Sequence, residues 1–138
     1  MTGLTRSEYL LDIDFSAEYA LLQEQEAKPA KLFYVSKPWV GAADSSEARL
    51  LLAKILEGLT DASNGNCAFL LLGEAVQALL PDAVCSLPVH KLLQLGIPVY
   101  VAKLSLEYLA VAAPDEAKVV ADDEIAGLLL RYEVVTLS

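Results

Sequence analysis

The chain has 138 residues, enough for one domain with a substantial core, and 55% of its residues are hydrophobic. Its formal net charge of −9 argues against direct nucleic-acid binding, which requires a surface that attracts phosphate. Two cysteines and a single histidine predict neither a disulfide framework nor a metal site.

The apolar residues do not form a membrane segment. No apolar run approaches the roughly 20 residues that a membrane helix needs. The first residues, "MTGLTRSEYLLDIDF", lack the basic start and continuous apolar stretch of a signal peptide. We therefore expect a cytoplasmic protein without a membrane partner, whose apolar surplus serves both a large core and a subunit interface.

Residues 1–29 are predicted to form an amino-terminal arm, followed by a main domain at 30–138. Within the arm, 8–15 resembles a strand, and 16–27 has the pattern of a helix with acids on one face. The stretch "AKPAK" then breaks the pattern and marks the boundary.

Strands and helices alternate through the main domain. The predicted strands are short apolar runs at 31–36, 67–72, 97–101, 118–121 and 133–138. The predicted helices lie at 44–59, 74–81, 105–111 and 122–132, and a further helix within 82–96 has Pro88 in its first turn and Gly96 at its end. This alternation is typical of βαβ units and predicts a three-layer α/β sandwich with a mostly parallel central sheet, flavodoxin-like in general plan.

The helix at 44–59 carries the clearest pattern. Asp44 or Ser45 is expected to cap it, with Glu47 in its first turn. Its predicted apolar stripe consists of Leu51, Leu52, Ile55, Leu56 and Leu59.

Fingerprints of common catalytic sites are missing from the sequence. There is no glycine-rich dinucleotide or P-loop motif and no nucleophile elbow, so no cofactor is expected. The adjacent acids at 122–124 are predicted to cap a helix rather than to bind a metal ion.

Cys85 and His90 form one candidate site, five residues apart at the start of a predicted helix. The positive end of the helix and a nearby imidazole would acidify the thiol and make it a nucleophile. The alternative, which we favour, is that Cys85 is a buried, inert residue and His90 lies on the helix surface. Cys67, at the start of an apolar strand, is expected to pack in the core.

The predicted strand ends form a second candidate site, because ligands of parallel α/β proteins bind at the carboxyl ends of strands. Ser36, Gly73 and Lys103 lie at or just after the ends of three of the predicted strands. Lys103 is either an anion or partner contact or a solvated charge that ends its strand, and the second reading is favoured. Trp39, in the loop after the first strand, is either a lid over the core or an interface anchor.

Four stretches, in the same order, resemble the DsrE/DsrF-like superfamily, whose members include sulfur-relay subunits. "KLFYVSKPWVGAADSSEARLLLAKIL" is similar to the first strand, loop and helix of that family, and most like its DsrF/TusC branch. "AFLLLGEAVQALLP" is similar to the second strand and helix of that family, and "GIPVYVAKLSLEYLAV" to its third strand and short helix. "DDEIAGLLLRYEVVTLS" is similar to its closing helix and strand. The resemblance runs from Lys31 to Ser138.

What the resemblance implies about the role of this protein depends on the residue at position 102. In the catalytic DsrE and TusD members, a cysteine at the end of the third strand carries persulfide sulfur, and Ala102 occupies that position here. DsrF/TusC-type subunits also lack this cysteine and help to build a hexamer around a catalytic sister subunit. The resemblance therefore implies an accessory, non-catalytic subunit in a homo- or hetero-oligomer with DsrE-like subunits.

Two alternatives stay open. One is a sulfurtransferase or persulfide carrier that uses Cys85, assisted by His90 or Lys103. The other is a regulatory α/β module that binds a small molecule near Ser36, Gly73 and Lys103.

Overall fold

Five parallel strands form the centre of the structure, a computed structural model that describes residues 30–62 and 66–138. The strands are β1 (Lys31–Val35), β2 (Cys67–Leu71), β3 (Val99–Ala102), β4 (Lys118–Val120) and β5 (Glu133–Leu137). Their order in the sheet is β4-β3-β2-β1-β5. The predicted arm at 1–29 lies outside the described residues, so the arm and the domain boundary remain predictions.

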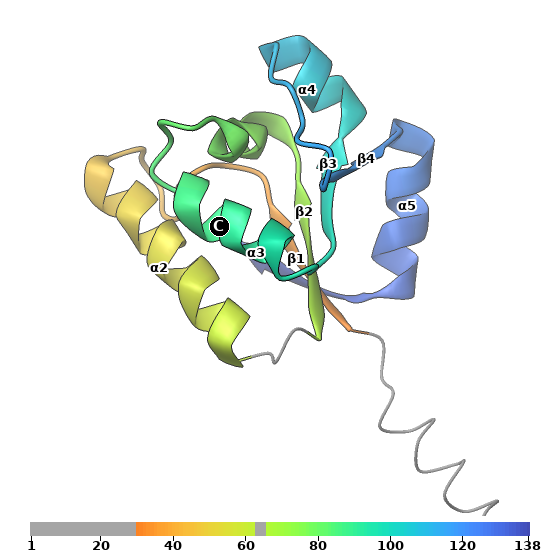
Figure 1. Cartoon of the computed structure of the whole chain (residues 1–138), viewed down its shortest axis with the longest axis horizontal. Helices are drawn as coiled ribbons and strands as arrows, with labels where there is room; N and C mark the ends of the chain where they lie inside the picture. The colour runs from red at the N-terminus through yellow and green to blue at the C-terminus, as the bar shows by residue number, and fades with distance from the viewer. Residues whose placement is uncertain (1–29, 63–65) are drawn as a thin grey trace, which may run out of the picture.

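Helices cover both faces of this sheet (Figure 1). The first face carries α2 (Ser46–Ala62), the 3₁₀ helix η1 (Gly73–Leu79), α3 (Ser86–Gln94) and α4 (Lys103–Leu109). The second face carries α5 (Asp122–Arg131). The three-layer α/β sandwich with a parallel sheet is therefore confirmed.

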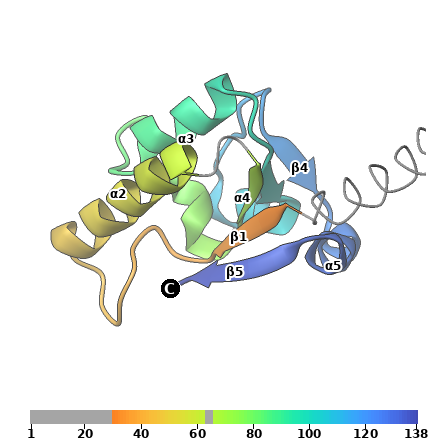
Figure 2. The ribbon, with the colours of Figure 1, turned by 90° about the horizontal axis from the view of Figure 1, so that it is seen from below.

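The strand order explains this division of the helices. From β1 to β4 each strand is added on the same side of the previous one, so right-handed crossovers place all the intervening helices on one face. After β4 the chain returns across the sheet and adds β5 at the opposite edge, beside β1 and parallel to it. This crossover runs in the opposite sense along the sheet, so it places α5 on the other face. Figure 2 shows α5 leading into β5 at the sheet edge beside β1.

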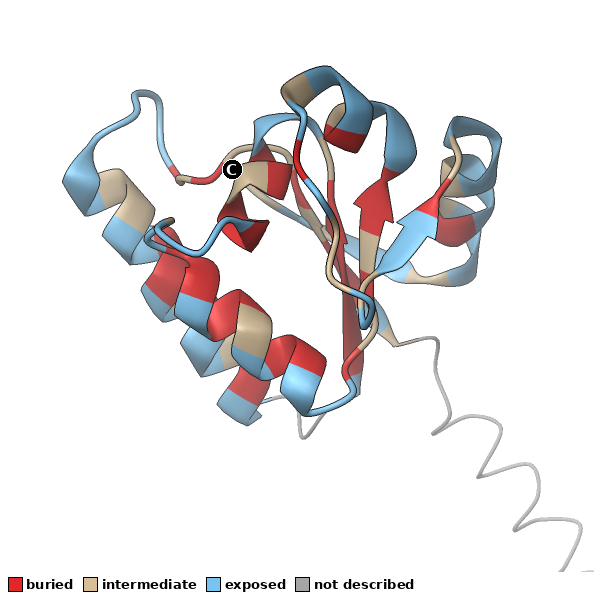
Figure 3. Ribbon diagram, turned by 45° about the horizontal axis from the view of Figure 1, so that its top comes forward, coloured by how far each residue is buried: buried red, intermediate tan, exposed pale blue. Residues whose placement is uncertain are grey.

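Burial follows the position of each strand in the sheet (Figure 3). All five residues of β2 are buried, as predicted for a strand covered on both faces. The larger core packs strand residues such as Phe69 against α2 and α3, and the smaller core packs Leu70 against Leu128 of α5.

The structure of α2 confirms the predicted cap at Ser45 and corrects the predicted stripe. The backbone N–H of Ala48 donates a hydrogen bond to Ser45 Oγ at 3.0 Å. Leu52 and Leu56 are buried, but Leu51 is exposed, so its assignment to the stripe was wrong. Ile55 and Leu59 are half-buried and pack against the same core, as predicted. Ala53 and Thr60, which were not predicted, complete the buried face.

The segment after β2, predicted as a short helix, is a 3₁₀ helix. The helix α3 begins at Ser86, directly after Cys85, which agrees with the predicted position of Cys85 at a helix start. Pro88 lies in the first turn of α3, as expected, and Gly96 follows its end with a φ of +76°. None of the described helices combines the length and the apolar character needed to cross a membrane.

Candidate functional site

The carboxyl ends of β1, β2 and β3 lie side by side, because these strands are parallel neighbours. Their last residues are followed by Ser36, by Leu72 and Gly73, and by Lys103. This edge is where a parallel α/β sheet offers backbone groups and loops to a ligand. It is therefore the candidate functional site.

Gly73 joins the ends of β1 and β2. Its φ is +58°, and a Cβ built on it would lie 3.1 Å from the carbonyl oxygen of Ser36. Its backbone N–H donates a hydrogen bond to Ser105 Oγ in α4 at 2.8 Å. Two of the predicted binding residues, Ser36 and Gly73, therefore lie close together. The hydrogen bond from Gly73 to Ser105 links them to α4.

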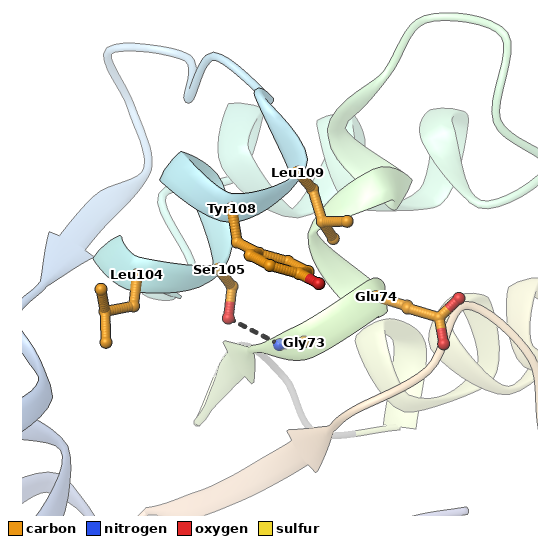
Figure 4. A pocket seen from close by; sticks show the side chains of 6 residues that line it. All are labelled: Gly73, Glu74, Leu104, Ser105, Tyr108 and Leu109. Atoms are coloured by element: carbon orange, nitrogen blue, oxygen red, sulfur yellow. Dashed lines mark hydrogen bonds between the residues drawn. The ribbon is translucent and has the colours of Figure 1, made fainter.

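A cavity of about 360 Å³ lies between η1 and α4 (Figure 4). Its lining is mainly apolar, and its polar side-chain groups are the hydroxyls of Ser105 and Tyr108 and the carboxylate of Glu74. Tyr108 is largely exposed. A cavity of this size and character can hold a small molecule or an apolar side chain. Its lining residues are Gly73, Glu74, Leu104, Ser105, Tyr108 and Leu109.

Glu74, Ser105 and Tyr108 were not among the site residues predicted from the sequence. Ser105 and Gly73 are 32 residues apart, and only their hydrogen bond reveals the link between them. Leu104 and Tyr108 are four residues apart in α4, so they share one helical face. This spacing is the feature of the sequence that could have indicated that both line one cavity.

Ala102 is the last residue of β3 and the residue before α4. It is only 3% exposed and pairs with Val120 of β4. Its methyl group offers neither a nucleophile nor a hydrogen bond. The chemistry of this strand end is therefore limited to the backbone and to neighbouring side chains.

Lys103 is exposed and lies apart from Ser36 and Gly73. It is absent from the lining of the first cavity and instead lines a second one, of about 370 Å³, between the starts of α4 and α5. Acidic side chains contribute to that cavity, whose full lining is Lys103, Leu104, Glu107, Ala121, Asp122 and Asp123.

Cys85 is buried at the residue before α3, with 1% of its surface exposed. Its thiol donates a weak hydrogen bond to the backbone oxygen of Arg49, with Sγ and O 3.7 Å apart. Burial raises the pKa of the Cys85 thiol to about 11, although the positive charge of Arg49 acts in the opposite direction. An activated nucleophile requires a lowered pKa, so this environment does not provide the acidification that the sequence hypothesis required.

His90 contacts its own helix rather than Cys85. Its Nδ1 lies 2.8 Å from the backbone oxygen of Ser86 and 3.3 Å from Ser86 Oγ. The backbone carbonyl oxygen of Ser86 can only accept a hydrogen bond, so the 2.8 Å contact favours a proton on His90 Nδ1. Among the described residues, Cys85 and His90 share no hydrogen bond, so the thiol–imidazole pair is not formed. The favoured prediction, that Cys85 is a buried residue, is confirmed.

The remaining predicted residues have structural contacts. Cys67 is buried at the start of β2, and the backbone N–H of Ala121 donates to Glu124 Oε1 at 2.9 Å, which confirms the capping role of an acid in 122–124. The half-buried ring of Trp39 lies 5.4 Å from Lys37 Nζ and 5.6 Å from the guanidinium carbon of Arg49.

The sequence matches no protein-family model and gives no significant match among curated proteins. The structure is similar to the crystal structure of the YchN protein from E. coli, with a TM-score of 0.59 and 20% sequence identity. The similarity covers 78% of this chain and 99% of the YchN chain. At this identity the likeness concerns the fold alone, and it agrees with the α/β fold that the sequence resemblance implied.

Proposed function

We propose that this protein is an accessory, non-catalytic DsrE/DsrF-like subunit of an oligomeric, intracellular sulfur-trafficking assembly. The observation that carries the proposal is Ala102 at the carboxyl end of β3, where the resemblance places the persulfide cysteine of catalytic members. A methyl group cannot form a thiolate, so the subunit would contribute surface to the assembly rather than carry sulfur.

The environment of the cysteines supports this role. The chain has two cysteines, and both are buried. The raised pKa of Cys85 keeps its thiol protonated at neutral pH, and a persulfide carrier needs the thiolate. The competing proposal, a sulfurtransferase that uses Cys85, would require this thiol to become exposed and acidic.

The direct test is the intact mass of the reduced protein after incubation with a persulfide donor. We expect no added sulfur on the wild-type chain or on Cys85→Ser. The positive control is Lys103→Cys, which places a thiol at the exposed residue directly after the strand end, and we expect it to gain sulfur. Sulfur that is added to the wild-type chain and lost in Cys85→Ser would reject the accessory role and establish Cys85 as the carrier.

The cavity between η1 and α4 favours a second candidate function, the binding of a small molecule. Its volume and its apolar lining with a few polar groups are typical of ligand pockets. Saturation-transfer NMR with a mixture of small aromatic and aliphatic fragments tests this proposal. Fragment signals that disappear in Leu109→Trp, which would fill the cavity, support binding there, whereas signals unchanged in that variant place the fragments elsewhere.

A further inference from the structure

We propose that the free edge of β5 pairs with β5 of a second copy of this chain, antiparallel and about a two-fold axis at Val135. The central sheets of two copies would then form one continuous sheet. This inference names a surface for self-association, and it stands whether or not the protein handles sulfur.

One edge of β5 is open in the described part of the chain. β5 pairs with β1 along all five of its residues, and no described strand lies on its other side (Figure 2). Its burial differs sharply from that of β2, because Glu133, Val134 and Thr136 are exposed and Val135 and Leu137 are only half-buried. Strands of parallel sheets are normally covered on both faces, so among the described strands β5 is poorly covered compared with β2.

The backbone groups on the open edge follow from the pairing with β1. The N–H of Glu133 donates to the carbonyl oxygen of Ala30 at 3.3 Å, so Glu133 directs its backbone groups toward β1. In a parallel ladder this direction alternates along the strand. Val135 and Leu137 therefore also face β1, while Val134 and Thr136 direct their N–H and C=O groups outward.

Within the described residues, the sequence of β5 itself lacks the features by which edge strands are protected. Protected edge strands are short or carry lysine, proline or a bulge. The opposite edge strand, β4, is three residues long and begins with Lys118. β5 has five residues in regular register with β1, no proline and no lysine, and its single charge is at its first position, Glu133.

The sequence of β5 is complementary to itself in the antiparallel direction. With the two-fold axis at Val135, Val134 of each copy lies opposite Thr136 of the other, and each of these two pairs exchanges both of its backbone hydrogen bonds. This is the register in which every outward N–H and C=O of both strands is used. Glu133 then lies opposite Leu137 of the second copy, so the two Glu133 carboxylates stay at opposite ends of the seam.

The side chains at the seam also suit this partner. Val134 is 38% exposed, and the arrangement would cover it with a threonine side chain, a favourable β-branched cross-strand pair. Val135 would lie opposite Val135 of the second copy, at a non-hydrogen-bonded position of the ladder, where side chains approach closely. A five-residue seam buries less than the roughly 800 Å² per partner of a standard interface, so we expect a dimer that dissociates on dilution.

Thr136→Pro tests the proposal, since proline removes the outward N–H of residue 136 and leaves the bonds to β1 in place. The matched control is Thr136→Val, which keeps the N–H. Sedimentation velocity of the full chain over a range of concentrations should show the same association for wild type and Thr136→Val, and a smaller species for Thr136→Pro. A wild-type chain that is monomeric throughout, or association that Thr136→Pro leaves unchanged, would overturn the proposal.

Hydrogen exchange of the wild-type amides provides a test that needs no variant. The amides of Val134 and Thr136 should become protected as the protein concentration rises, whereas those of Glu133, Val135 and Leu137 should be protected at every concentration. Unprotected Val134 and Thr136 amides in the associated protein would contradict the seam. Protection of these two amides that does not depend on concentration would mean that the chain covers its own edge, which also rejects the proposal.

Discussion

Gly73 has a backbone conformation that other residues adopt only with strain. Its φ of +58° lies in the left-handed region, where a side chain costs about 1–2 kcal/mol, and its missing Cβ leaves room for the Ser36 carbonyl. The sequence indicated that a glycine ended the second strand. The contact with Ser36 and the hydrogen bond to Ser105 could not be predicted, because they join segments far apart in the chain.

We expect Gly73→Ala to lower the free energy of unfolding by about 1–3 kcal/mol, from the left-handed conformation and the close contact together. The matched control is Gly58→Ala, because Gly58 lies inside α2 and a Cβ there has nothing within 4 Å. Alanine should stabilise that position by about 0.5–1 kcal/mol. Urea unfolding of both variants measures the two effects, and equal effects of the two substitutions would contradict the role assigned to Gly73.

At the scale of elements, the prediction succeeded where local pattern and tertiary packing agree. The five strands are apolar runs bounded by turn residues, and each was found within a few residues of its predicted position. The errors occurred where packing decides between similar local patterns. Leu51 and Leu52 are both leucines of α2, and only the position of the sheet determines that Leu52 is buried and Leu51 exposed.

The site shows the same division. Strand ends could be predicted from the sequence, so Ser36 and Gly73 were placed correctly at one edge of the sheet. The proximity of Cys85 and His90 in the sequence suggested a shared site, but each side chain contacts a different partner. Spacing along a helix start does not fix which way two side chains point.

Among the described residues, α5 is the one helix that covers the second face of the sheet, and this makes it a sensitive element. Leu128 is 1% exposed in the smaller core, while Leu130 in the same helix is 87% exposed. We expect Leu128→Ala to destabilise the protein by about 2–5 kcal/mol, because it leaves a cavity between α5 and the sheet. Leu130→Ala should change stability by less than about 0.5 kcal/mol. Thermal or urea unfolding separates them, and a loss of similar size in both variants would refute the packing described for α5.

At the scale of the whole molecule, burial of the Cys85 thiol couples folding to alkaline pH. The ordinary pKa of the thiol, 9.0, applies to the unfolded chain, and burial raises the pKa to about 11 in the folded protein. Between these two values the unfolded chain binds fewer protons than the folded one, so the free energy of unfolding falls as pH rises. Below pH 9 both states are protonated and the coupling disappears.

We therefore expect stability to decline between pH 9 and 11, with Cys85 contributing a slope of up to about 1.4 kcal/mol per pH unit. The pKa of Tyr132 is also raised, chiefly by its hydrogen bond with Tyr100, and it adds to the decline in the same direction. Urea unfolding of wild type and Cys85→Ala at several pH values isolates the thiol, because the tyrosine contribution is common to both. A smaller slope in Cys85→Ala would establish that the folded state holds this thiol protonated, as a non-catalytic subunit requires. Equal slopes would mean that the thiol ionises as readily in the folded protein as in the unfolded chain, and Cys85 would again be a candidate sulfur carrier.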